Sequence, residues 1–524
     1  MNSGGVSREV CDYVIVGGGS AGCVLASRLS EQPEVDVLLI ERGGRYSRLA
    51  LGVPLLGMLN IKSRLHTHRT SPQPACRHRR IELPVARGLG GGSSINAMIY
   101  VRGGRRAYDR WEEQGAPGWS YENVLPYFRR MEDFEGGADR YHGVDGPLAV
   151  SKTRYQSSFG SAFIEACVEA GLPHNDDFTG ADQFGAGSYQ LTQAHGERSS
   201  TALGYLRPAR SRGNLRVWSR TRVDRVAFDG DRAVAVHCSG TRGHRMVSVR
   251  REVILSAGAL ETPKILMLSG VGAADELWSL GITPVLDLPG VGAGLQDHVR
   301  CRVVYAHGAP VRLSPLALLL PFLRWCVARD GIFTSTKVAG GAFLRLSDAS
   351  DLVDCQLVAQ WSGSPPHRDA VDIHTCLMDV ESRGSVRLTS KDPKDDPVVN
   401  PNYLSAQREV DIMIQGIRFT RSLAQTRALE AFGLQEELLP GPEVRSVGEL
   451  ASYVRGSVET CFHPAGTCRM GTDDDAVVDP LLRVRGLEGL RVVDASIMPS
   501  LINGNTNGPT IMIAEKAADL IRRG

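Results

Sequence analysis

DYVIVGGGSAGCVLASRL, residues 12–29, is the most informative stretch of this 524-residue chain. Its first five residues form an apolar run that ends in glycines, which is typical of a buried parallel strand. Apolar residues from Ala21 to Leu29 then recur at helical spacing, up to about Glu31. A second apolar run, Val35 to Ile40, is closed by Glu41. Strand, glycine turn, helix and strand within about thirty residues predict a βαβ unit.

The turn of this unit contains the pattern G-x-G-x-x-G at Gly17, Gly19 and Gly22. The first glycine permits the tight turn, the second lets a pyrophosphate approach the backbone, and the third lets helix and strand pack closely. Free N–H groups and the dipole at the helix N-terminus favour phosphate there. Glu41 lies 19 residues after Gly22, where a carboxylate accepts hydrogen bonds from ribose hydroxyls and repels a 2′-phosphate. The turn therefore predicts an unphosphorylated dinucleotide.

A competing pattern overlaps the same turn. Residues 18–22 also fit G-x-S-x-G, the nucleophile elbow of α/β-hydrolases, with Ser20 as the nucleophile. An elbow normally follows several strands, whereas this turn follows the first strand of the chain. The third glycine and Glu41 would also have no role in hydrolysis, so hydrolysis is the remote alternative.

The rest of the chain gives a coarser pattern of elements. Residues 43–86 look irregular, and the segment from about 305 to 450, which has few motifs, predicts most of a second domain. The expected elements are two helical pieces in Tyr108–Phe134 around Pro117-Gly118, antiparallel strands in Leu215–Val249, a buried strand at Arg251–Ala257, a helix at Thr262–Ser269, a strand at Leu490–Val493, and a helix at Thr510–Ile521.

The bulk properties are those of an ordinary globular protein. Hydrophobic residues make up 42% and charged residues 23%, and the net charge of +2 gives no argument for nucleic acid. The basic run Arg77-His78-Arg79-Arg80 is expected to be a solvated loop. Eleven irregularly spaced cysteines favour reduced thiols, and Met1–Val10 has no signal-peptide pattern, so we expect a cytoplasmic location. Leu316–Phe322 is too short to span a bilayer and predicts a buried or substrate-lining helix, with peripheral membrane contact the lesser option.

Four segments together resemble the glucose–methanol–choline (GMC) family of flavin oxidoreductases, in its choline dehydrogenase-like and hydroxymethylfurfural oxidase-like branch. They span nearly the whole chain in the expected order. They are the βαβ unit; RGLGGGSSIN, residues 87–96, continuing to Val101-Arg102-Gly103; GALETP, residues 258–263, with Leu266, Ser269-Gly270 and Gly272; and the C-terminal block with HPAGTCRMG (463–471), VDAS (493–496) and GNTNGPT (504–510).

The resemblance implies that the dinucleotide is FAD. It also implies an α/β fold, α+β overall, in which a Rossmann-type FAD domain carries a substrate domain built on an antiparallel sheet with helices. We expect the FAD domain to comprise residues 1–155, 201–305 and 456–524, and the substrate domain residues 156–200 and 306–455. The expected FAD contacts are Gly17, Gly19, Ser20, Ala21, Gly22, Glu41, Arg42, Arg87, Gly91, Gly92, Ser93, Asn96, Ala97, Met98, Val223, Ala257, Gly258, Asp494, Ala495, Asn505, Pro509 and Thr510.

The resemblance also implies a catalytic pair. His463 matches the family's catalytic histidine, and Asn507 matches its partner, which is His or Asn across the family. Histidine titrates near neutral pH and suits removal of a hydroxyl proton, while Asn507 would hold the substrate oxygen. Some family members tether FAD through a histidine at the position of Ile95, which cannot form that bond. We therefore expect non-covalent FAD.

Other sites and reactions stay open at this point. Cys461, His463 and Cys468 lack a fourth nearby metal ligand, and His66, His68, Cys76 and His78 form only a loose group, so no metal is expected. The resemblance implies oxidation of a small-molecule alcohol, with O₂ or a quinone-like carrier as acceptor. Pro464 follows the histidine, as in many dehydrogenase-like members of the family, which favours the carrier. A lyase of the same fold that keeps FAD without net redox chemistry is the alternative. The sequence is compatible with a monomer or a homodimer.

Overall fold

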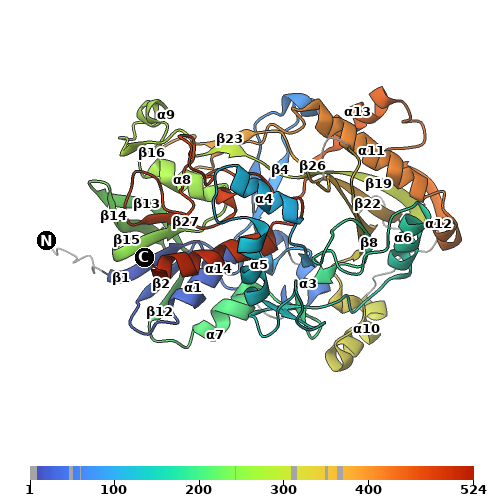
Figure 1. The fold of residues 1–524 in the computed structure, drawn as a ribbon, viewed down its shortest axis with the longest axis horizontal. Helices are drawn as coiled ribbons and strands as arrows, with labels where there is room; N and C mark the ends of the chain where they lie inside the picture. The colour runs from blue at the N-terminus through green and yellow to red at the C-terminus, as the bar shows by residue number, and fades with distance from the viewer. Residues whose placement is uncertain are drawn as a thin grey trace.

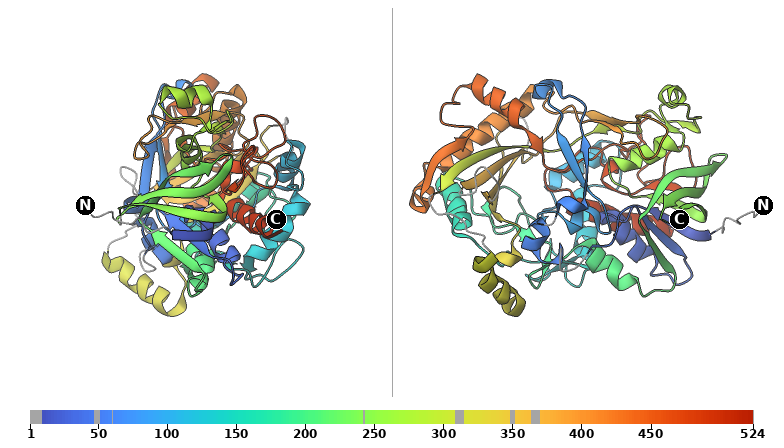
Figure 2. Two further views of the ribbon diagram at one scale, coloured as in Figure 1. Left: turned by 90° about the vertical axis from the view of Figure 1, so that its left-hand side faces the viewer. Right: turned by 180° about the vertical axis from the view of Figure 1, so that it is seen from behind.

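The computed structural model describes residues 9–46, 51–59, 61–241, 243–307, 315–347, 352–362 and 370–523. Two large sheets organise this part of the chain (Figure 1). The first sheet lies at the end of the molecule that carries the C-terminus, and the second lies at the opposite end beneath a group of helices (Figures 1 and 2). The predicted α/β fold with a second, antiparallel sheet is confirmed.

The first sheet contains the predicted βαβ unit, in which α1 (Ser20–Leu29) connects β1 to β2. Its strand order is β12-β2-β1-β15-β14-β13, and β27 pairs with β15. The pairs β12–β2, β2–β1, β1–β15 and β15–β27 are all parallel. The strands are β1 (Glu9–Val16), β2 (Val37–Glu41), β12 (Leu215–Ser219), β13 (Thr221–Asp229), β14 (Arg232–Gly240), β15 (Gly243–Leu255) and β27 (Leu490–Val492).

One expectation for this sheet was wrong, and another was right in position but not in length. β12 was expected in an antiparallel group, but it pairs parallel to β2 at the edge of the sheet, so its partner is a strand far from it in the sequence. The strand expected at 251–257 is the second half of the 13-residue β15. β15 pairs with strands of both directions: its first half is antiparallel to β14, and β1 runs parallel to it.

The second sheet is antiparallel and has the order β25-β19-β22-β21-β20-β8, with β26 beside β19. Helices cover one of its faces: a Cβ placed on Gly416 of α11 would lie 2.3 Å from Thr375 and 3.2 Å from Cys355. The elements are β8 (Gly185–Gly187), β19 (Val299–His307), β20 (Val338–Leu344), β21 (Cys355–Ser362), β22 (Ala370–Leu377), β25 (Leu434–Leu439), β26 (Glu459–Thr460), α6 (Ser158–Glu169), α11 (Gln407–Leu423), α12 (Arg427–Phe432) and α13 (Val447–Ser457).

The remaining elements lie outside the two large sheets. They are α3 (Pro54–Leu59), η1 (Lys62–Arg64), β3 (Leu65–Arg69), η2 (Pro74–Cys76), β4 (Glu82–Ala86), η3 (Gly91–Ser94), β5 (Ile99–Tyr100), α4 (Arg105–Glu113), α5 (Tyr121–Met131), β6 (Glu132–Phe134), β7 (Leu148–Val150), β9 (Gln190–Leu191), β10 (Gln193–Ala194), β11 (Glu197–Arg198), η4 (Ala202–Leu206), α7 (Arg207–Ala209), α8 (Glu261–Leu268), β16 (Val271–Gly272), α9 (Ala274–Ser279), β17 (Leu286–Asp287), β18 (Ala293–Leu295), α10 (Pro315–Ala328), η5 (Ile332–Thr334), β23 (Gly384–Arg387), β24 (Val398–Asn400), η6 (Ala495–Ile497) and α14 (Asn507–Arg523).

The segment 43–86, expected to be irregular, contains an antiparallel hairpin of β3 and β4. Its strands are rich in His, Arg and Pro and lack the regular apolar alternation by which strands are recognised. The hairpin lies between the two halves of the molecule (Figure 2). The neighbouring basic run is exposed apart from the half-buried Arg79, as expected.

Helix α10 differs from the expectation of a buried helix. Leu319, Leu320, Leu323 and Val327 are exposed, at 52%, 76%, 50% and 88%. Only part of its apolar surface packs inward, where Trp325 contacts a small cluster with Phe333. The side chains of residues 316 and 317 lie outside the described residues. Within the described ranges, no helix combines the length and apolar character needed to cross a bilayer.

A buried carboxylate ties the predicted C-terminal helix α14 to the βαβ unit. Glu515 is fully buried and accepts hydrogen bonds from Arg28 of α1, Arg130 of α5 and Tyr205. Two guanidinium groups and a phenol compensate its desolvation, which an unpaired buried carboxylate could not sustain. The network fixes α14, whose first turn carries the Asn507 predicted for the catalytic pair.

Candidate active site

The glycine turn has the geometry that its sequence predicts. Gly17 has a φ of +101°, which a residue with a side chain rarely adopts. A Cβ on Gly22 would lie 1.9 Å from the carbonyl oxygen of Gly17, so only glycine allows the helix to start this close to the strand. No side chain caps the N-terminus of α1. Its first N–H groups are therefore directed toward any anion that binds there.

A second glycine-rich loop lies against this turn and leaves open space beside it. A Cβ on Gly91 would come within 2.8 Å of the Cα of Gly19, so the loop of residues 87–96 contacts the turn directly. By contrast, a Cβ on Gly92 or on Gly258 would meet no atom within 4 Å. The signature loops thus contribute glycines that border free space, which fits the close approach of a pyrophosphate to backbone.

Two carboxylates, Glu41 and Asp494, accept hydrogen bonds from backbone N–H groups in or beside the glycine loops. Glu41 is buried and accepts hydrogen bonds from the N–H groups of Gly18 (2.9 Å) and Gly43 (2.6 Å). Asp494 accepts from the N–H of Gly258 and from the Thr262 hydroxyl. Each carboxylate oxygen has two lone pairs, so Glu41 retains the capacity to accept from ribose hydroxyls. The residues present therefore fit FAD.

The other predicted FAD contacts divide into two groups. Ser93 and Asn96 have partners within the protein: Ser93 Oγ donates to Gly90 O, and Asn96 Oδ1 accepts from Arg198. Arg42 forms an ion pair with Glu261 at 2.8 Å, and Arg87 is exposed. The remaining predicted contacts lie in or beside the signature segments or on β13, without a polar contact that assigns them a role: Ala21, Ala97, Met98, Val223, Ala257, Ala495, Pro509 and Thr510.

His463 lies in a polar network with His298, which directly precedes β19, and Met378, which directly follows β22. Its Nδ1 is 2.9 Å from Nδ1 of His298, and Nε2 of His298 is 3.2 Å from the carbonyl oxygen of Met378. A carbonyl only accepts, so His298 Nε2 carries the proton and His298 Nδ1 is the acceptor. His463 Nδ1 must then be the donor, which leaves the lone pair on His463 Nε2. The network selects the tautomer that a base needs.

Burial keeps His463 neutral. Burial, with a smaller contribution from the Arg300 guanidinium, lowers the pKa of His463 to about 3. Its backbone N–H donates to Asp297 (2.8 Å), which also accepts from Tyr403 and Thr460. Burial raises the pKa of Asp297 to about 6. The imidazole is thus fixed in position and unprotonated near neutral pH.

The structure places two asparagines differently from the expectation. Asn505, expected at the cofactor, has its Nδ2 3.4 Å from His463 Nε2 and accepts from Gln356 at 3.4 Å. Asn507, expected to pair with His463, accepts a hydrogen bond from Ser20 Oγ at 2.9 Å. Ser20 is thereby engaged with an amide at the start of α14. Asn507 thus links the two helix N-termini, while Asn505 contacts the candidate base.

Sequence reasoning did not find His298, Asp297, Arg300 or Gln356. They lie in segments without a signature, far from His463 along the chain. The register Val299–Thr460 and Arg300–Glu459 between β19 and β26 brings the first three to His463. Gln356 lies on β21 and reaches His463 through Asn505. Only the Gln296-Asp297-His298 cluster of polar residues before a strand could have drawn attention to them.

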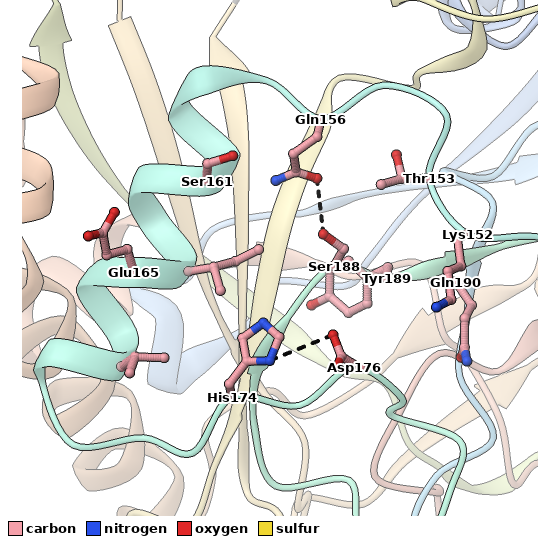
Figure 3. Close-up of a pocket in the computed structure, with 12 residues that line it drawn as sticks. Lys152, Thr153, Gln156, Ser161, Glu165, His174, Asp176, Ser188, Tyr189 and Gln190 are labelled. Atoms are coloured by element: carbon pink, nitrogen blue, oxygen red, sulfur yellow. Dashed lines mark hydrogen bonds and ion pairs between the residues drawn. The ribbon is translucent and has the colours of Figure 1, made fainter.

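A cavity of about 690 Å³ opens between α6 and residues 172–190 (Figure 3). Gln156 and Ser188 are hydrogen-bonded across it at 3.0 Å, and His174 faces Asp176 at 3.6 Å. Neither His463 nor Asn507 lines it. We therefore place the chemistry at His463 and not in this cavity.

The two loose groups of possible metal ligands separate in the structure. Among the described residues, one group of at least three possible ligands exists: His66, His68 and Asp396, whose nearest donor atoms lie within 4.8 Å of one another. Cys76, which the sequence places in the same loose group, contacts the carbonyl oxygen of Tyr403. All eleven cysteines are free thiols.

Comparison with known proteins gives one consistent result. The family described as GMC oxidoreductase matches residues 11–300 with its N-terminal part and residues 380–514 with its C-terminal part. The human mitochondrial choline dehydrogenase is 41% identical over 99% of this chain and 91% of its own length. An alcohol dehydrogenase [acceptor] from Pseudomonas putida is 40% identical over 98% of this chain and 96% of its own length.

Solved structures agree. The crystal structure of pyridoxine 4-oxidase from Mesorbium loti superposes with a TM-score of 0.90 and 31% identity, covering 98% of this chain and 99% of the other. Formate oxidase superposes with a TM-score of 0.91 at 25% identity, covering 98% of each chain. The similarity therefore includes both sheets and the loops between them.

Proposed function

Because the chain belongs to the GMC oxidoreductase family and its cofactor is FAD, we propose that it oxidises an alcohol to a carbonyl with His463 as the base. The enzyme is an alcohol oxidoreductase of this family. The observation that supports the proposed role of His463 is the chain of contacts from Met378 through His298 to His463, which leaves a neutral imidazole with its lone pair on Nε2.

The protein's own groups account for the proton and for the position of the alcohol. His463 Nε2 accepts the proton of the substrate hydroxyl. His298 keeps His463 in the required tautomer, and Asp297 holds its backbone. Asn505 Nδ2 lies where it can donate to the substrate oxygen, so we propose Asn505, in place of Asn507, as the group that orients the substrate. FAD, when bound, supplies the acceptor for the hydride.

The role of His298 leads to a testable expectation. His298→Phe keeps a ring of similar volume but removes the Nδ1 acceptor, so His463 can adopt either tautomer. We expect flavin reduction to slow by about tenfold, the effect of one lost hydrogen bond of about 1.4 kcal/mol. Stopped-flow reduction under anaerobic conditions measures this rate. An unchanged rate, with FAD content equal to that of the wild type, would contradict the tautomer assignment.

The attachment of FAD is a second expectation. Ile95 is buried in the loop where some relatives carry a tethering histidine, and a hydrocarbon side chain forms no bond to a flavin. We therefore expect acid precipitation to release the yellow colour into the supernatant. A flavin that stays with the precipitated protein would show that another residue forms a covalent bond.

The electron acceptor is proposed to be either O₂ or a quinone-like carrier, with preference for the carrier. Parallel measurements of H₂O₂ formation and of dye reduction with the same alcohol distinguish the two. Dye reduction that greatly exceeds H₂O₂ formation would support a dehydrogenase, and the reverse would support an oxidase. A lyase of the same fold would produce a product in neither assay while keeping its flavin oxidised.

A further inference from the structure

The face of the second sheet opposite α11 and Thr375 carries many polar side chains, together with the apolar Val304 and Val358. Side chains alternate along a strand, so residues that pair across strands share one face. Thr375 and Cys355 contact α11, and their neighbours in sequence therefore lie on the opposite face. That face carries, from β19, β22 and β21, the side chains Arg300, Arg302, Asp372, His374, Cys376, Gln356 and Gln360.

This polar face is the one directed at the candidate base. Gln356, which belongs to it, donates to Asn505, and Asn505 contacts His463. His298, two residues before Arg300, contacts His463 from the same side. The substrate alcohol, bound at His463 Nε2, therefore has these side chains as neighbours.

Arg300 is the unbalanced charge among them. Arg302 is fully paired with Asp372, at 2.6 Å. Arg300 instead contacts Nδ1 of His374 at 3.2 Å, which is neutral because burial lowers its pKa, and Glu459 at 3.3 Å. Glu459 is 47% exposed, so water screens this ion pair. The remaining acidic neighbour, Asp297, has its oxygens occupied by Tyr403, Thr460 and the backbone of His463.

Arg300 also has an unused donor. Its Nε–H is buried and has no hydrogen-bond partner among the described residues, and its guanidinium lies 5.2 Å from the centre of the Phe462 ring, beside His463. A buried donor without a partner is costly, and an acceptor on a bound ligand would satisfy it. The positive charge of Arg300, which also lowers the pKa of His463, at the same time repels a cation bound beside His463.

We propose that Arg300 selects alcohols whose far end is an anion or a hydrogen-bond acceptor, and that it rejects quaternary-ammonium alcohols such as choline. This inference rests on the proposed function, since it assigns a substrate class to the site at His463. It distinguishes this chain from the relatives that are named choline dehydrogenases. Arg300 acts in binding and specificity, and His463 remains the base.

Two matched pairs of alcohols test the charge preference. Choline and 3,3-dimethylbutan-1-ol have nearly the same shape and differ in one positive charge. Likewise, 4-hydroxybutanoate and 4-methylpentan-1-ol differ in one negative charge. For the wild type we expect kcat/KM for choline to lie about 100-fold below that for its neutral counterpart, the effect of one unit charge about 6 Å away at an effective dielectric constant of about 20. The kcat/KM for 4-hydroxybutanoate should exceed that for 4-methylpentan-1-ol.

Charge reversal provides the control. Arg300→Glu should invert both preferences, and Arg300→Gln should remove them, with FAD content checked in each. Arg324→Glu is the matched control, because it makes the same charge change on the exposed helix α10. The proposal is overturned if wild-type enzyme uses choline as well as its neutral counterpart, or if the Arg300 variants that hold FAD keep the wild-type ratios. Reduction of the flavin by none of the four alcohols would instead contradict the proposed function.

Discussion

His463→Ala is expected to slow the anaerobic reduction of bound FAD by alcohol roughly 10²–10⁴-fold, the usual effect of removing a general base. The reason is the position of its Nε2 lone pair, which His298 and the Met378 carbonyl create. Without it, the hydroxyl proton has no acceptor held at the substrate. Stopped-flow absorbance at saturating alcohol measures the rate directly.

A matched variant separates loss of the base from general damage. His244→Ala removes an exposed histidine on β15 and should leave the rate unchanged. Both variants should contain FAD in wild-type amounts, because no contact of His463 supports the glycine turn. Normal flavin reduction by His463→Ala enzyme with FAD bound would show that another group removes the proton.

Gly22→Ala is expected to have the second largest effect, on cofactor binding and stability together. Its Cβ would lie 1.9 Å from the carbonyl oxygen of Gly17, so helix α1 must move away from β1. Overpacking of this kind costs about 1–3 kcal/mol of stability. It also displaces the helix N-terminus that holds the phosphates, so the variant should purify largely without flavin. Thermal unfolding with and without added FAD measures both effects.

Two other glycines make this experiment specific. Gly92→Ala places a Cβ in open space, so the protein without FAD should keep wild-type stability while its affinity for FAD falls. Gly448→Ala also meets no atom within 4 Å, but it lies on α13, in the helical layer of the second sheet, and should lower neither stability nor FAD affinity. Wild-type FAD affinity in either Gly22→Ala or Gly92→Ala would contradict the proposed role of the two glycine loops in binding FAD.

The sequence predicts the cofactor half of the molecule well, because that half is built from local rules. A strand, three glycines and an acidic residue lie within 30 consecutive residues, Asp12 to Glu41, and the physical role of each can be stated without knowing the rest of the fold. The predicted unit is β1, α1 and β2. The terminal helix was predicted for the same reason, since apolar periodicity is a local property.

The residues around His463 are harder to predict from the sequence, because their positions depend on pairing between strands that are distant in the chain. His298 and His463 are brought together by β19 and β26, and nothing local to either residue indicates this. The parallel pairing of β12 was missed for the same reason. Helix α10 shows a different limit. Its apolar composition predicts a buried helix, but burial depends on which other elements pack against it, and one apolar face of α10 is exposed.

The most direct test of the central claim is anaerobic mixing of the purified, FAD-loaded protein with a panel of alcohols while the visible flavin absorbance is recorded. We expect at least one alcohol to bleach the flavin, and an added electron acceptor to restore the colour while the matching carbonyl compound accumulates. A flavin that remains oxidised with every alcohol, although FAD is bound and the protein is folded, would contradict the account.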